Sequence, residues 1–285
     1  MRSLLTRPTG RVFICTLLLF AACEEQQVTT PGPAERVVTL APNLTELVYA
    51  VHAQAKLVGT DNFSDYPESA KTLPKVGGLQ PNVEKIVSLK PDLVLASTSS
   101  APPNLEASLR AAEIPLVWVK TDRLDDVPQA MVLIGAHLGV LDVPVYAARL
   151  RESIAAQKRT RAHPPRVLFA VWTNPLYVAG RNNFTDDLLQ LTGATNAVTV
   201  SGWPQYSLES LVANPPDLIL HPDKSVTPRA IEELLDAAPG LRGRTKVIAV
   251  DENVFVRPGP RMTIAARRLN AILDEEGRRQ AAGGR

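Results

Sequence analysis

The chain has 285 residues, of which 45% are apolar and 21% are charged. This length is typical of one large or two modest domains, and the apolar content is sufficient for a packed core, which excludes a disordered chain. The 31 basic and 29 acidic residues give a net charge of +2, a near balance that argues against nucleic-acid binding. Two cysteines are too few for a disulfide framework or a thiolate zinc site.

Residues 1–22 have the pattern of a secretory signal, because three arginines precede or begin an apolar run that is too short for an ordinary transmembrane helix. The two alanines before Cys23 are similar to a bacterial lipobox, in which the cysteine is lipidated and becomes the N-terminus. Phe20 stands where a lipobox usually has leucine, so cleavage of an ordinary signal near this point is the alternative. Residues 23–34 are polar and rich in breakers, which predicts a tether.

Removal of the signal changes both the charge and the thiol content of the chain. The signal holds three of the 31 basic residues and no acid, which leaves 28 basic against 29 acidic residues and a net charge of −1. Cys15 leaves with the signal, and Cys23 is expected to be blocked by its lipid. The exported body is therefore predicted to have no free thiol.

Strand and helix signals alternate from residue 35, which predicts βα units around largely parallel sheets. The first expected helix begins with a capping-box pattern from Asn43 to Glu46. In the first part of the chain we expect strands at 36–40, 56–60, 92–96 and 115–119, and helices at 43–52, 82–89 and 105–112.

Helix-compatible sequence fills the middle of the chain from residue 127 to about 161, with an interruption near residues 142–144. Its second half, 145–162, predicts one helix of about 18 residues and ~27 Å. Beyond Pro165 the alternation restarts. There we expect strands at 166–172, 177–179, 217–221 and 246–250, and helices at 185–192, 227–238 and 262–276.

An internal repeat favours a division into two lobes. Residues 82–96 (NVEKIVSLKPDLVLA) and 207–221 (SLESLVANPPDLILH) are identical at six of fifteen positions. The alternative to a duplication is that a helix followed by a Pro-Asp pair and a strand is a common local pattern in α/β proteins. We predict an N-terminal lobe at 35–142, a bridging helix at 143–163 and a C-terminal lobe at 164–280. A continuous bridging helix predicts a stiff hinge that permits only small closure.

Short motifs follow one another in a characteristic order along the chain. They lie at residues 36–42, 45–46, 58–59, 65–67, 76–78, 82–84, 90–93, 180, 193–196 and 203–209. In these motifs, over about residues 35–275, the sequence resembles the periplasmic binding proteins of ABC importers for cobalamin, ferric siderophores and haem. The resemblance implies an α/β protein with two Rossmann-like lobes joined by one long rigid helix, and a ligand in the cleft between the lobes.

The likeness is greatest to the cobalamin-binding members, because of residues 63–67 (FSDYP), 203–209 (WPQYSLE) and 253–261. Leu79 stands where some cobalamin binders place a tryptophan, and residues 97–98 replace another expected aromatic side chain. The resemblance implies cobalamin as the ligand, with a ferric siderophore or haem as the alternative.

Aromatic side chains near the ends of strands and in loops are the candidates for ligand contact, because a corrin or porphyrin presents a broad apolar face. The predicted ligand contacts are Phe63, Tyr66, Leu79, Tyr177, Trp203, Phe255 and Arg257. The forked guanidinium of Arg257 suits a planar acceptor on the ligand, although a solvated arginine is the alternative. Trp118 and Trp172 end predicted strands and are expected in the core.

Glu84 and Glu209 occupy matching positions of the repeat, each in the first turn of a predicted helix. The resemblance implies that they point outward and dock on arginines of the permease, one in each half, which gives orientation more than affinity. The alternative is that each glutamate only stabilises its own helix through the helix dipole, by about 0.3–1 kcal/mol.

Metal and enzyme chemistry find little support in the sequence. The four histidines lack ligand spacing, and the chain has neither a glycine-rich phosphate loop nor a G-x-S-x-G motif. The acidic pairs at 125–126 and 186–187 have the pattern of solvated helix faces. We therefore predict no catalytic site, no metal site and no resident cofactor.

The resemblance and the leader together predict an exported, lipid-anchored substrate-binding protein in the periplasm or on the outer face of the cell membrane. Its expected partners are an ABC permease and ATPase complex, to which it delivers a corrinoid. A surface enzyme or an adhesion module on the same fold is the second alternative.

Overall fold

The computed structural model describes residues 32–100 and 102–283. The predicted signal and the predicted lipidation site, Cys23, lie outside the described residues, as does most of the predicted tether. Among the helices of the described part, none is long and apolar enough to cross a membrane.

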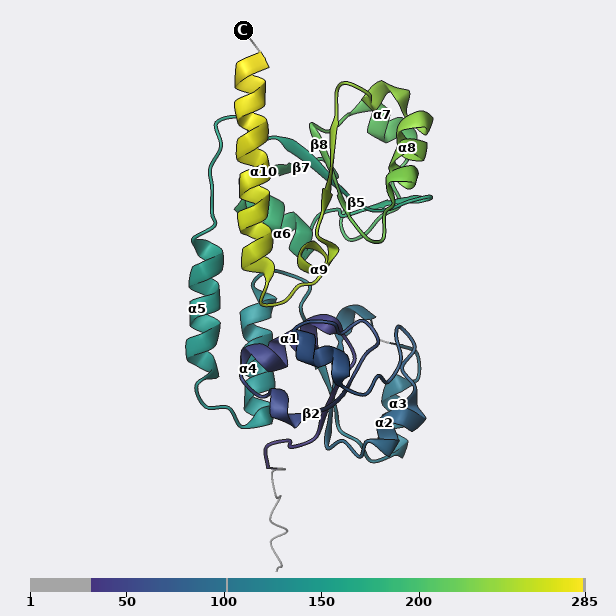
Figure 1. Ribbon diagram of the computed structural model, residues 1–285, viewed down its shortest axis with the longest axis vertical. Coiled ribbons are helices and arrows are strands. Elements are labelled where there is room, and N and C mark those ends of the chain that lie inside the picture. Colours follow the sequence, from purple (N-terminus) through teal and green to yellow (C-terminus); the bar gives the residue numbers. More distant parts are fainter. Residues whose placement is uncertain (1–31, 101, 284–285) are drawn as a thin grey trace, which may run out of the picture. The chain divides into compact units, whose positions relative to one another are not determined.

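A four-stranded parallel sheet forms the first lobe, in the strand order β2-β1-β3-β4 (Figure 1). Successive side chains of a strand point to opposite faces, so Val37 and Leu95 enter one hydrophobic core while Val38 and Val94 enter another. Both faces of the sheet are covered by other elements, which explains why the strand sequences are short continuous apolar runs. The strands are β1 (Val37–Thr39), β2 (Leu57–Thr60), β3 (Leu93–Ser97) and β4 (Leu116–Val119).

Helices lie on both faces of this sheet (Figure 1). α1 (Pro42–Ala50) and α4 (Asp126–Leu138) pack on one face, whereas α2 (Val83–Ser88) and α3 (Leu105–Ala111) pack on the other. Three short 3-10 helices complete the lobe: η1 (Gln54–Lys56), η2 (Glu68–Thr72) and η3 (Thr98–Ser100).

The helix expected across residues 145–162 is shorter than predicted, because α5 runs from Val143 to Ala155. Residues 156–165 continue as an irregular segment, and the second lobe supplies hydrogen-bond partners for its backbone. The Arg159 amide donates to the Leu191 carbonyl (2.9 Å), and the Asn270 side chain donates to the Gln157 carbonyl (2.8 Å). Tertiary hydrogen bonds thus replace the helical ones, and the link between the lobes is a helix followed by a loop.

The second lobe is built around a sheet in the order β6-β5-β8-β9 (Figure 1). The long strand β5 pairs in parallel with β8 and β7 and antiparallel with β6. The strands are β5 (Arg166–Thr173), β6 (Leu176–Val178), β7 (Thr195–Asn196), β8 (Leu218–Pro222) and β9 (Lys246–Val250). The predicted α/β class with two lobes is therefore confirmed.

Helices also cover both faces of the second sheet. Side chains of α6, α9 and α10 share one core with Phe169 and Leu220, and side chains of α7 and α8 share the other with Leu168 and Ile219. The helices are α6 (Phe184–Leu191), α7 (Leu208–Ala213), α8 (Pro228–Ala237), η4 (Pro239–Leu241), α9 (Glu252–Phe255) and α10 (Met262–Gly283). The last helix, α10, also packs against α5.

The repeated Pro-Asp pairs have the same structural task in both lobes. The Asp92 carboxylate accepts hydrogen bonds from the amides of Glu35 and Arg36, which lead into β1. In the second lobe the Asp217 carboxylate accepts a hydrogen bond from the Arg166 amide, where β5 begins (2.7 Å). Each aspartate therefore fixes the start of the strand beside its own, and this shared function supports the predicted lobe duplication.

Candidate functional site

A cavity of about 500 Å³ lies between the two lobes. The first lobe contributes the end of β3, the start of α1 and the loop after β4. The second lobe contributes the start of α6, the loop around Trp203 and the loop before α10. The lining residues are Ala41, Asn43, Ser97, Ser99, Ser100, Thr121, Asp122, Asn182, Asn183, Phe184, Gly202, Trp203, Val256 and Pro258.

A smaller cavity of about 70 Å³ adjoins it in the first lobe and shares Ala41, Ser97 and Ser100 with it. Phe63 and Leu79 line this hollow, and both are exposed, Leu79 by 78%. Large exposed apolar side chains beside a cavity are typical of a binding surface. The predicted contacts Phe63, Leu79 and Trp203 are thus at the cleft.

The second lobe gives the cavity an aromatic wall. The rings of Phe184 and Trp203 lie 6.0 Å apart at 51°, and Trp203 is 46% exposed. The Asn183 side chain donates to the carbonyls of Gly180 and Gly202 and so holds the Trp203 loop. A Cβ at Gly180 would lie 2.0 Å from the Val200 carbonyl oxygen, so only glycine permits this approach. Sequence reasoning missed Phe184, which begins α6 directly after its cap.

The first lobe gives the cavity a polar wall of hydroxyl, amide and carboxylate groups. Ser99 Oγ donates to Asp122 Oδ1 (2.5 Å), and the Asn43 side chain donates to Thr121 Oγ1 (2.9 Å). Asn43 also donates to the Pro258 carbonyl of the second lobe (3.1 Å). The prediction of a capping box at Asn43 is therefore wrong, because α1 begins after Ala41 without a side-chain cap and Asn43 serves the cleft.

Glu46, the other member of the expected capping box, forms an ion pair across the lobes. Arg261 donates from Nε to Glu46 Oε2 (2.8 Å) and from Nη2 to Oε1 (2.5 Å). The guanidinium of Arg261 also lies 4.0 Å from the ring centre of Tyr66. Burial raises the pKa of the Glu46 carboxyl above its ordinary value, although the hydrogen bonds and charge of Arg261 act in the opposite direction.

Arg257 belongs to the same cross-lobe cluster. Its Nη1 donates to Asp65 Oδ1 (2.5 Å) and lies 3.8 Å from Glu46 Oε1, and its Nη2 donates to the Phe63 carbonyl. Only 14% of its side chain is exposed. Carboxylates of the first lobe already occupy its guanidinium, so Arg257 bridges the two lobes, and its contact with a ligand oxygen stays a prediction.

A second ion pair joins the lobes at Arg123 and Asp187. Arg123 Nε donates to Asp187 Oδ2 (2.8 Å), Nη2 contacts the other oxygen, and the Leu124 amide donates to the same carboxylate. Asp186, its neighbour in α6, is 2% exposed and accepts hydrogen bonds from Asn182 and Asn196. The interpretation of residues 186–187 as a solvated acidic pair is therefore wrong.

The predictions for four more aromatic residues have different outcomes. Phe255 is 2% exposed and packs in the core of the second lobe, so its prediction as a ligand contact is wrong. Trp172 is 50% exposed, so its prediction as a core residue is wrong. Tyr66 and Tyr177 are exposed but line neither of the two cavities at the cleft. The hydrophobic pattern alone did not distinguish these environments.

Glu84 and Glu209 are exposed and stand in the first turns of α2 and α7. The side chains of Asn82 and Ser207 cap the two helices by accepting hydrogen bonds from backbone amides three residues on. Neither glutamate forms an ion pair with a described residue. The helices are therefore already capped, which leaves both carboxylates available to a partner.

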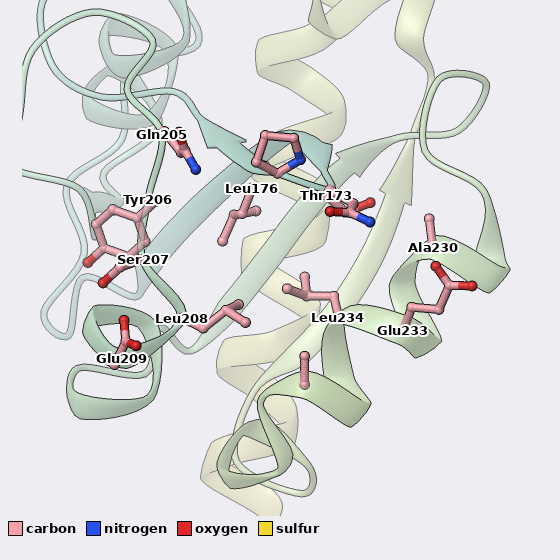
Figure 2. A pocket seen from close by; sticks show the side chains of 13 residues that line it. Thr173, Leu176, Gln205, Tyr206, Ser207, Leu208, Glu209, Ala230, Glu233 and Leu234 are labelled. Atoms are coloured by element: carbon pink, nitrogen blue, oxygen red, sulfur yellow. The ribbon is translucent and has the colours of Figure 1, made fainter.

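A separate groove of about 380 Å³ lies on the second lobe beside Glu209. Figure 2 shows Glu209 and Glu233 on opposite sides of this groove, with Leu176, Leu208 and Leu234 between them. The groove is formed by the β5–β6 turn, the start of α7 and one face of α8. It is distinct from the cleft between the lobes. In the described residues no group of three His, Cys, Asp or Glu side chains is placed to hold a metal ion.

Two α/β lobes with a cavity between them, lined from both sides, define a two-lobed ligand-binding protein. A match to the family described as periplasmic binding protein extends over residues 37–245, and the chain belongs to this family. Proteins of this family are exported substrate-binding components of ABC importers and not enzymes. This agrees with the resemblance seen in the sequence.

Individual relatives are similar over most of their length. The vitamin B12-binding protein of Pectobacterium atrosepticum is 30% identical over 255 residues, which are 85% of this chain and 89% of the relative. The periplasmic heme-binding protein RhuT from Roseiflexus has a TM-score of 0.74 at 30% identity, covering 84% of this chain and 97% of that one. The periplasmic vitamin B12-binding protein BtuF of Vibrio cholerae has a TM-score of 0.69 at 26% identity, covering 85% and 97%.

Proposed function

We propose that the protein binds a corrinoid, cobalamin, in the cavity between its lobes and delivers it to an ABC importer. The observation that carries this proposal is the two-sided lining of the cavity. Phe184 and Trp203 offer aromatic surface to a flat macrocycle. The hydroxyl and amide groups of the first lobe, such as Ser97 and Asn43, suit the amide groups at the edge of a corrin.

The cavity lining favours a corrinoid over haem. Proteins hold haem iron through an axial His, Cys, Met or Tyr side chain. None of these residue types is among the residues that line the two cavities at the cleft. Cobalamin brings its own axial ligands, so it needs shape, aromatic surface and hydrogen bonds instead. The B12-binding relatives support the same choice, whereas the heme-binding neighbours favour the alternative.

Calorimetric titration of the purified chain with cyanocobalamin tests the proposed ligand. We expect saturable heat at micromolar protein with one site per chain. A parallel titration with hemin, followed by its Soret band, is the control, and there we expect no saturable shift. Heat with neither compound, or a Soret shift without cobalamin binding, would refute the corrinoid assignment.

We propose further that Glu84 and Glu209 dock the protein on the permease. The matching helix-start positions, the exposure and the lack of ion pairs within the described chain support this role. One carboxylate on each lobe sets the orientation of the protein on a transporter with two similar halves. Charge reversal of the two glutamates, with transport and ligand binding measured separately, tests this role.

Lipidation of Cys23 is proposed from the sequence alone, because this residue lies outside the described part. Two or more acyl chains on the mature N-terminus make a stable membrane anchor. Labelling cells with a palmitate analogue tests the anchor. We expect incorporation into the wild-type chain and none into the Cys23→Ser variant. Equal labelling of both, or of neither, would contradict the proposed lipidation.

A further inference from the structure

Among the described residues, the lining of the cavity between the lobes includes a carboxylate but no basic side chain. Asp122 is half-buried in its wall and accepts one hydrogen bond, from Ser99 Oγ, on Oδ1. Its second oxygen has no hydrogen-bond partner among the described residues. In the part of the chain that the structure describes, no lysine or arginine lines this cavity or the adjoining one. Asp122 therefore places a negative charge where a ligand meets the first lobe.

The basic residues next to the lining residues in the chain have other partners or are exposed. Lys120, which precedes the lining residue Thr121, is 62% exposed and lies 3.6 Å from Asp126. Arg123 is paired with Asp187, and Arg257 is paired with Asp65. Arg181 precedes the lining residue Asn182, but it is exposed and does not line the cavity. The other carboxylate of the cleft, Asp61, is 1% exposed and accepts the Phe63 amide, so it is occupied within its own loop. Asp122 is the carboxylate that remains for a ligand.

We infer that Asp122 selects the ligand by charge, so that the cleft accepts a neutral or cationic corrinoid and disfavours a macrocycle carrying carboxylates. A propionamide edge group donates N–H to the second oxygen of Asp122. A propionate in the same place has no proton to donate and brings a second negative charge. Two such charges about 6 Å apart in a half-solvated cleft weaken binding about tenfold. This inference rests on the proposed function and specifies which tetrapyrroles the site takes.

The matched probes are cyanocobalamin and its three monocarboxylate isomers, in each of which one propionamide is hydrolysed. For the wild-type protein we expect at least one isomer to bind about tenfold more weakly than cyanocobalamin at low ionic strength. The difference should shrink in 0.5 M salt, because added ions screen a partly exposed pair. A deficit caused by shape alone would not depend on salt.

The matched variants are Asp122→Asn and Asp125→Asn. Asparagine at 122 keeps the shape and still accepts the Ser99 hydroxyl, so we expect the discrimination against that isomer to fall to within about twofold. Asp125 is exposed, lies three residues away and does not line the cavity, so its variant should keep the full discrimination. Equal binding of all four compounds by the wild type overturns the inference. So does unchanged discrimination in Asp122→Asn. A wild type that binds no cyanocobalamin contradicts instead the proposed function itself.

Discussion

Glu46 in α1 and Arg261 before α10 are 215 residues apart in the chain and form a two-point ion pair between the lobes. Both side chains are largely buried, with 3% of Glu46 and 13% of Arg261 exposed. Together with the pair of Arg123 and Asp187, this pair links the two lobes. The sequence predicts a stiff hinge from a continuous helix, and the structure adds ion pairs contributed by both lobes as a second set of contacts between them.

Removal of Arg261 should destabilise the fold strongly. Arg261→Met leaves the Glu46 carboxylate buried without its partner, which costs about 3–5 kcal/mol. Urea unfolding at neutral pH measures the change in the free energy of unfolding. Replacing both partners, Glu46→Leu with Arg261→Met, removes the unpaired charge and should recover most of the loss.

An exposed ion pair within the first lobe is the control for this prediction. Arg110 and Glu106 pair on the surface of α3, with 77% and 56% of their side chains exposed. Arg110→Met should cost no more than about 0.5 kcal/mol. If Arg261→Met costs as little as Arg110→Met, the cross-lobe pair does not hold the cleft together.

The Asp65–Arg257 pair should make stability depend on pH in the acid range. Although partial burial acts to raise it, the hydrogen bond and charge of Arg257 hold the pKa of Asp65 below 3.8. A carboxyl whose pKa is lower in the folded state contributes stability that is present above 3.8 and is lost as pH falls through the folded value. The melting temperatures of wild type and Asp65→Asn should thus differ between pH 7 and 5 and converge towards pH 3.

The pH comparison has an internal check in Arg257→Met. Loss of Arg257 removes the cause of the lowered Asp65 pKa. The melting temperatures of Arg257→Met and the wild type should therefore also differ at neutral pH and converge in acid. If the difference in melting temperature between wild type and Asp65→Asn stays constant from pH 7 to pH 3, the assigned Asp65–Arg257 pair is contradicted. Because Asp65 is about one third exposed, we expect the size of the effect to be small.

The fold was predictable from the sequence because its signals are local. Strand and helix bounds follow from apolar runs, breakers and caps, and the expected strand at 246–250 agrees with β9 at both ends. The repeated Pro-Asp pair was visible as a pattern, and its reason, an aspartate that binds the start of the neighbouring strand, needed the structure. The bridging helix was extended too far because residues 156–162 favour a helix locally but bond to the other lobe.

The site was less predictable, because its residues are set by contacts between distant segments. Asn43 and Glu46 have capping-box spacing, yet both side chains contact the second lobe, more than 200 residues away. Phe184 and Phe255 are each at one end of a short helix, and nothing local indicates that the first borders the cleft and the second enters the core. Trp203 was found because a tryptophan between glycine and proline is rare in a core.

Trp203 should account for a large part of ligand binding. Its exposed ring lies beside that of Phe184 at the cavity, so Trp203→Ala removes aromatic area that we expect a corrin to cover. We expect cyanocobalamin to bind about 10- to 100-fold more weakly, as measured by calorimetry. Trp172→Ala is the control, because Trp172 is equally exposed but does not line the cavity. The affinity of Trp172→Ala for cyanocobalamin should stay within about twofold of the wild type. Equal losses of affinity in the two variants would argue against the cavity as the binding site.

Charge reversal at Glu84 and Glu209 should separate transport from ligand binding. Both carboxylates lie outside the cleft cavities, so Glu84→Arg and Glu209→Arg should bind cyanocobalamin within about twofold of the wild type. Each reversal places a positive charge opposite a basic site on the proposed permease surface, where like charges repel. Uptake of labelled cyanocobalamin should fall about tenfold in either single variant and further in the double variant.

Two exposed glutamates elsewhere on the surface control for charge alone. Glu106 on α3 and Glu232 on α8 are in surface ion pairs, and their reversal to arginine changes the net charge by the same amount. We expect uptake to remain near the wild-type level in these two variants, because neither glutamate is at a helix start of the repeat. Normal uptake by the Glu84 and Glu209 double variant would refute docking through the matched helices. Reduced uptake with reduced ligand affinity would point to a folding defect, which unfolding curves of the same variants detect.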